Sequence, residues 1–220
     1  MKKKILIFIL SIWFSNAYSR TFHLNLGTSL SKLDWKYIYQ EGYEQQYDDP
    51  LLGFAFSTGV EYLEQKYYSI SSDLLFYNSG GKYSEEELNT NFVFNSPEKI
   101  SVCYLSLGSS FNFNPISNNF KLQLSLGPRI DYIINGAKNE PYNWIDEGNG
   151  LNKFNFGFTA GVGLYYNIDD YIFGLNAQYL YRFKKLADLD PSDAPQYTYG
   201  GVVATEQVIL FGVSLGYRIK

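Results

Sequence analysis

The sequence has few of the residues that most often carry chemistry. Its 220 residues include one cysteine, one histidine and one methionine. A lone cysteine, Cys103, excludes an internal disulfide and a redox pair of thiols. With His23 as the only histidine, the sequence also cannot supply the set of His and Cys ligands that zinc prefers. We therefore expect no metal site and no cofactor.

Long hydrophobic runs are also scarce. The apolar run at residues 5–14 is too short to span a bilayer, and no other segment approaches the ~20 apolar residues of a transmembrane helix. This run follows three lysines and precedes Ala17-Tyr18-Ser19, whose small first and third residues suit a signal peptidase. The pattern predicts a secretory signal peptide over residues 1–19, cleaved before Arg20, and a single domain over residues 20–220.

Basic residues do not predominate either. The formal net charge is −4, and loss of the three lysines at residues 2–4 would make it −7. An acidic chain is poorly suited to the phosphate backbone of nucleic acids. We expect no nucleic-acid partner.

What the sequence does contain is a repeated alternation of apolar residues with small or polar ones. A period of two is the side-chain period of a β-strand and excludes a helix. The fourth segment is less regular than the others. The eight segments cover residues 22–33, 52–64, 68–78, 100–113, 120–134, 154–166, 171–183 and 208–219.

The gaps between these segments alternate in length. About 17 to 24 residues follow the first, third, fifth and seventh segments, and about 4 to 6 follow the second, fourth and sixth. Short periplasmic turns and long extracellular loops are the rule in outer-membrane barrels. The sequence therefore predicts an all-β fold, an eight-stranded antiparallel up-and-down transmembrane β-barrel. We expect it to lie in the cell outer membrane as a monomer, with periplasmic termini and contacts to membrane lipid and lipopolysaccharide.

The composition of the two strand faces indicates which one meets lipid. One face is rich in Leu, Phe and Tyr, whereas the other is mostly Gly, Ser, Asn, Thr and Ala, which suit the narrow lumen of eight strands. Aromatic side chains near strand ends are typical of the girdles at membrane interfaces, although aromatics also favour strands in general. The expected girdle residues are Phe22, Tyr62, Tyr67, Tyr68, Phe76, Tyr77, Tyr132, Phe154, Tyr165, Tyr166, Tyr171, Phe183 and Tyr217.

The small face also carries charged residues, three acids and three arginines. Isolated ions are costly in a narrow lumen, so these side chains are expected to pair with one another. Such a network would fill the barrel and prevent it from acting as an open pore. The predicted network consists of Glu61, Asp73, Arg129, Asp131, Arg182 and Arg218.

The long gaps are acidic and rich in tyrosine. Sixteen of the 22 acids fall there, including Asp34, Glu44, Asp49, Asp188 and Glu206. These acids could bind divalent cations that bridge to lipopolysaccharide, or simply keep the loops solvated. The loop aromatics, which include Trp35, Tyr47 and Trp144, suit protein or glycan binding, or packing of the loops on one another.

Catalysis is not expected. Some eight-stranded barrels act on lipid A with a histidine near the extracellular rim, but His23 begins the first segment, on the predicted periplasmic side. No other base or metal cluster appears at a recognisable spacing. We assign no catalytic, cofactor-binding or metal-binding residue.

Several strands resemble those of PorT-like outer-membrane β-barrel proteins. The similarity lies in Tyr104-Leu105-Ser106-Leu107, in the Gly-Pro segment at residues 126–134, in the Gly-Val-Gly segment at residues 156–164, and in the closing Leu215-Gly216-Tyr217-Arg218. The resemblance implies an outer-membrane protein of unknown or varied role, in a family whose best-known members serve protein secretion across the outer membrane. From it we expect a non-enzymatic binding or accessory component that acts through its surface loops. The alternatives are a surface adhesion or ligand-binding barrel and, less favoured, an enzyme that modifies lipid A.

Overall fold

The computed structural model describes residues 20–39, 42–82, 99–117, 119–136, 151–189 and 201–219. Within these residues all the regular secondary structure is β-strand. None of the described segments is a helix long and apolar enough to cross a membrane. The expected signal peptide and parts of the expected long loops lie outside the described residues.

Ten strands make up the described chain. Eight of them correspond to the eight predicted segments, and two short ones, β2 and β9, are additional. The strands are β1 (Arg20–Tyr39), β2 (Gly42–Gln46), β3 (Asp49–Tyr62), β4 (Tyr68–Lys82), β5 (Lys99–Ser117), β6 (Phe120–Asn135), β7 (Phe154–Ile168), β8 (Tyr171–Arg182), β9 (Ala187–Leu189) and β10 (Gly201–Ile219).

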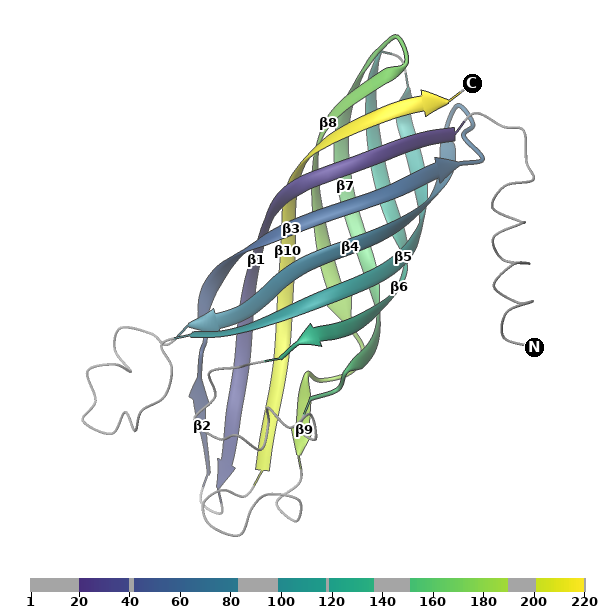
Figure 1. Ribbon diagram of the computed structural model, residues 1–220. Helices are drawn as coiled ribbons and strands as arrows, with labels where there is room; N and C mark the ends of the chain where they lie inside the picture. Colours follow the sequence, from purple (N-terminus) through teal and green to yellow (C-terminus); the bar gives the residue numbers. More distant parts are fainter. Residues whose placement is uncertain are drawn as a thin grey trace, which may run out of the picture.

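The eight long strands close into a ring (Figure 1). Strands β3 to β8 pair in sequence order, β8 pairs with β10, and β1 pairs with both β3 and β10, all antiparallel. The β1–β10 seam runs from Arg20↔Ile219 to Ile38↔Gly201. Closure pairs the outermost strands, so the ring has no open sheet edge. The predicted eight-stranded antiparallel barrel is confirmed.

The two ends of the barrel differ. At one end lie the short connections at residues 63–67, 118–119 and 169–170, together with the paired residues Arg20 and Ile219. We call this the turn end; it is the upper end in Figure 1. The other end, which we call the loop end, carries β2, β9 and the strand ends at Lys82, Lys99, Asn135 and Gly201.

The strands at the loop end are longer than predicted. Strand β1 continues to Tyr39 and pairs there with β2, while β10 begins at Gly201 and pairs there with β9. These four segments project beyond the rest of the wall (Figure 1). Assigning all the acids of the long gaps to loops was therefore wrong for five of them, which lie in strands: Asp34, Glu44, Asp49, Asp188 and Glu206.

The fourth segment looks irregular in sequence because its inward positions near the loop end carry apolar side chains, the buried Ile100, Val102 and Tyr104. The register between β5 and β6 shifts between Cys103 and Tyr104, and again between Phe113 and Ile116. The first shift places its extra residue on β6 and the second lies beyond the predicted segment, so β5 itself alternates over residues 100–113. The strand itself, Lys99–Ser117, is longer at both ends than the predicted segment.

The apolar face points outward, as predicted. Exposed hydrophobic residues occur all round the wall; Leu52, for example, is 70% exposed and Phe120 67% exposed. Two expected girdle residues are exceptions, because Tyr77 is fully buried and Tyr165 lines an internal cavity. The ring of Tyr165 occupies the space that β-carbons would take at Gly163 and Gly174. Glycine at these two positions lets a tyrosine fit inside the narrow lumen.

Gly27 allows close contact at the seam that closes the barrel. A β-carbon at this position would lie 2.0 Å from the carbonyl oxygen of Phe211, whereas at Gly108 the nearest atom would be 3.5 Å away. We predict that Gly27→Ala lowers the free energy of unfolding by about 1 to 3 kcal/mol, because the seam must separate. Urea unfolding of the refolded protein in detergent would measure this change. Gly108→Ala is the control and should unfold at the wild-type urea concentration or slightly above it; equal midpoints for the two variants would contradict the prediction.

Candidate functional site

The lumen is the candidate functional site, and it is filled along most of its length. Towards the loop end it contains an apolar plug of fully buried side chains. Trp35 and Tyr47, which were expected in the loops, belong to this plug, so they pack inside the barrel. The plug consists of Leu33, Trp35, Tyr47, Ile100, Val102, Leu186, Val202 and Ala204.

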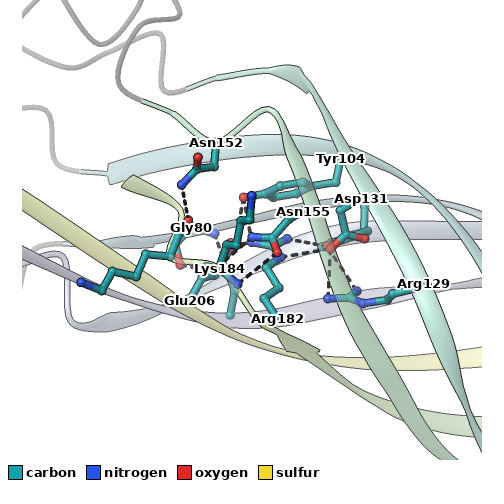
Figure 2. Close-up of polar contacts among 12 residues, drawn as sticks. Gly80, Tyr104, Arg129, Asp131, Asn152, Asn155, Arg182, Lys184 and Glu206 are labelled. Carbon is teal, nitrogen blue, oxygen red and sulfur yellow. Dashed lines mark hydrogen bonds and ion pairs between the residues drawn. The ribbon is translucent and has the colours of Figure 1, made fainter. Parts of the chain in front are cut away.

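Arg182 is the centre of a charged cluster within the barrel (Figure 2). Its Nε lies 3.1 Å from Asp131 Oδ2, and its other nitrogens donate to the hydroxyls of Tyr104, at 3.0 Å, and Tyr77, at 2.5 Å. The guanidinium also forms an ion pair with Glu206 and lies 4.0 Å from the centre of the Tyr104 ring. A single side chain of β8 thus contacts β4, β5, β6 and β10.

Arg129 completes the same cluster. Its Nη2 lies 3.1 Å from Asp131 Oδ2, so one carboxylate oxygen serves two arginines. The Tyr104 hydroxyl lies 2.9 Å from Glu206 Oε2. Two arginines therefore face two carboxylates, so this cluster carries no net formal charge. We call the set of Tyr77, Tyr104, Arg129, Asp131, Arg182 and Glu206 the Arg182 cluster.

A second cluster lies towards the turn end. Lys121 Nζ is 2.6 Å from Glu61 Oε1, which also accepts hydrogen bonds from Ser69 and from Gln123. Near this pair, His23 Nε2 lies 2.5 Å from Asp73 Oδ1, and Arg218 lies 3.3 Å from Glu64. Lys121 is 3.9 Å from Glu64 and so joins the two acids. We call the set of His23, Glu61, Glu64, Asp73, Lys121 and Arg218 the Glu61 cluster.

Small polar cavities lie beside the Glu61 cluster and between it and the Arg182 cluster. One of about 60 Å³ is lined by His23, Glu61, Asp73, Lys121 and several serines. It has room for about four to six water molecules. Another of about 30 Å³ has Asp73 and Arg129 among its lining residues and so extends towards the Arg182 cluster. Neither cavity crosses the apolar plug.

The structure divides the six charged residues expected in one network between two clusters. Arg129, Asp131 and Arg182 belong to the Arg182 cluster, whereas Glu61, Asp73 and Arg218 belong to the Glu61 cluster. Lys121 and Arg129 are eight residues apart on β6, which is about 26 Å along an extended strand. The six residues therefore pair as two local groups, because charges so far apart along the barrel pair with nearby partners.

Four charged partners were missed: His23, Glu64, Lys121 and Glu206. Two of them, Lys121 and Glu206, occupy positions that the alternation of the sequence predicts to face inward. Lys121 lies between the outward residues Phe120 and Leu122, and Glu206 continues the inward positions of β10 two residues before the predicted segment. The pairing of His23 with Asp73 depends on which strands face each other, which no single segment reveals.

The chemical groups near His23 do not form a nucleophilic site. Its hydrogen-bond partner in the described part of the chain is Asp73, and no serine hydroxyl is bonded to it there. The described residues also contain no group of three or more His, Cys, Asp or Glu side chains arranged to hold a metal ion.

Breaking the Arg182 cluster tests whether it stabilises the barrel. Arg182→Ala would leave Asp131 and Glu206 buried with too few cations, so we predict a loss of about 3 to 5 kcal/mol in the free energy of unfolding. Urea unfolding in detergent would measure it. Lys185→Ala is the matched control, since it breaks the exposed Lys185–Asp188 pair and should cost less than about 1 kcal/mol. Similar losses in both variants would contradict the structural role of the cluster.

Comparisons with known proteins agree with the fold. The sequence profile of the family described as "Outer membrane protein beta-barrel domain" matches residues 14–188. No curated protein matches the chain. Among solved structures, OprG from Pseudomonas aeruginosa is similar with a TM-score of 0.57 at 12% identity, over 91% of this chain and 97% of OprG.

Two further structures show weaker similarity. Neisserial surface protein A gives a TM-score of 0.46 at 11% identity, over 90% of this chain and 97% of its own. Ail of Yersinia pestis gives a TM-score of 0.44 at 13% identity, over 91% of this chain and 99% of its own. The profile match covers most of the chain and the closed barrel agrees with it. This chain therefore belongs to the outer-membrane protein β-barrel domain family and is an integral outer-membrane β-barrel protein.

Proposed function

We propose that this protein is a closed, non-enzymatic barrel that acts through its loop end as a binding or accessory component. The observation that carries the proposal is the filled lumen. The apolar plug and the Arg182 cluster occupy the barrel towards the loop end, and the cavities beyond them have room for only a few water molecules. A barrel with no passage for solutes acts through its surfaces.

In this proposal the loop end faces the outside of the cell and the turn end faces the periplasm. The difference between the two ends supports this orientation, because outer-membrane barrels have short periplasmic turns and long external loops. The projecting sheet formed by β2, β9 and the adjoining ends of β1 and β10 then becomes a surface offered to partners. Trp35 of β1 and Val202 and Ala204 of β10 belong to the apolar plug, which holds this sheet in place.

The proposed partner is a component of a protein-secretion apparatus. The resemblance of several strands to PorT-like barrels supports this choice over adhesion or lipid modification. In this proposal the barrel is a single-chain unit, because its ring closes within one chain.

Electrical recording tests the closed lumen. We predict that purified protein in planar bilayers shows no stable conductance above the bare membrane, because the apolar plug blocks the path of ions. A porin recorded under the same conditions provides the positive control. Large, long-lived openings from the wild-type protein would overturn the proposal of a closed scaffold.

A deletion strain tests the accessory role. We predict that loss of the gene reduces a broad set of secreted and surface proteins, measured by quantitative proteomics of the medium and cell surface. Wild-type protein should restore them, whereas a variant with residues 37–44 replaced by Asn-Gly should not, although its level in the membrane is normal. This replacement shortens the β1–β2 hairpin and keeps the Lys36↔Gln45 pair next to a two-residue turn. An unchanged protein profile in the deletion strain would rule out the secretion role.

A further inference from the structure

One sector of the outer wall carries a group of aromatic side chains next to the loop end. Tyr132 of β6 and Phe154 of β7 have ring centres 4.8 Å apart, and Phe183, which directly follows β8, contacts the rings of Phe158 and Tyr181. Phe154 is 62% exposed and Phe183 58% exposed. Aromatic rings in such a position lie at the boundary between acyl chains and headgroups. We call these five residues the aromatic shelf.

Two exposed lysines adjoin the shelf directly. Lys153 precedes Phe154, and Lys184 follows Phe183. Neither lysine has an acidic partner among the described residues, whereas the neighbouring Lys185 is paired with Asp188 at 3.0 Å. The shelf and the two lysines therefore combine an apolar surface with two cations that no described acid neutralises.

Hydrogen bonds fix the backbone that carries both lysines. The Asn155 side chain donates to the carbonyl of Lys184 at 2.8 Å and accepts from its amide at 3.3 Å, and Asn152 donates to the carbonyl of Lys185 at 2.8 Å. Figure 2 shows both asparagines beside this segment. The segments on either side of Phe154 and Phe183 are thus tied together, which keeps the two lysines on one stretch of the rim.

Another pair of lysines at the loop end lacks such surroundings. Lys82 and Lys99 face each other at the ends of β4 and β5. The next outward positions on β5 are Ser101 and Cys103, which offer no aromatic surface. The same charge therefore occurs at the loop end with and without an aromatic shelf.

We propose that the aromatic shelf, with Lys153 and Lys184, binds the phosphorylated headgroup of an outer-leaflet glycolipid of the lipopolysaccharide type. The acyl chains lie against the rings, and the lysine side chains extend to the phosphates at headgroup level. This assignment rests on the orientation given under the proposed function, which puts the loop end in the outer leaflet. A glycolipid is favoured over free phosphate because the cations lie beside a large lipid-facing apolar surface.

The test compares two double variants in nanodiscs of phosphatidylcholine. Binding of phosphorylated lipid A and of its dephosphorylated form is measured by native mass spectrometry on the full-length protein. We expect Lys153→Ala with Lys184→Ala to weaken binding of the phosphorylated lipid about thirtyfold. The matched control, Lys82→Ala with Lys99→Ala, removes the same charge at the same end and should bind as the wild type does.

Three outcomes would overturn the site. Equal weakening by the two double variants would mean that general charge at the loop end attracts the lipid. Equal binding of phosphorylated and dephosphorylated lipid would remove the role of the phosphate, and full competition by millimolar inorganic phosphate would make free phosphate the ligand. The orientation is tested separately with the variant Lys153→Cys. Intact cells that carry it are treated with a thiol reagent that does not cross the outer membrane, and we expect this cysteine to be labelled. If this cysteine is not labelled on intact cells, the orientation is disproved, whereas the nanodisc result is unaffected.

Discussion

The structure depends on one constraint, which is that a chain crossing lipid must pair its backbone hydrogen-bonding groups within itself. In this protein the β1–β10 seam meets that requirement by joining the first strand of the ring to the last. Closure in turn fixes the direction of every side chain. Most aromatic and aliphatic residues of the described strands face lipid, and the inward side chains, those of the apolar plug included, must fit within a lumen of eight strands.

The narrow lumen accounts for the way the charges are arranged. Ions placed there lose their hydration, so each needs a partner nearby. Asp131 serves two arginines, and Glu61 accepts from Lys121, Ser69 and Gln123. Each cluster brings together side chains from several strands, so each holds parts of the wall that are far apart in sequence. The apolar plug then closes the lumen between the Arg182 cluster and the loop end.

The sequence was sufficient to predict the features that repeat along each strand. Alternation identified the eight strands and their outward faces, and residues such as Leu52 and Phe120 lie where it indicated. It was insufficient where a property depends on neighbours across the barrel. Tyr77 reads as a girdle residue near a strand end, but its hydroxyl accepts from Arg182 on β8. Charge pairing was missed for the same reason, since His23 and Asp73 meet over Gly59 of β3, which pairs with both and has no side chain between them.

The length of the strands at the loop end was a second feature that the sequence did not predict. The acids of β1, β9 and β10 were assigned to loops because polar residues are common in both loops and strand ends, and only pairing distinguishes them. Trp35 shows the consequence, because it lies in β1 and packs in the plug.

The position of Glu206 has a consequence for how the barrel is completed. Strands β6 and β8 supply two arginines and one carboxylate to the Arg182 cluster, and the second carboxylate comes from β10. Without β10, this part of the interior would carry an excess positive charge. The strand that completes the seam therefore also supplies the balancing charge, so that a barrel open at its seam is also an electrically unbalanced one.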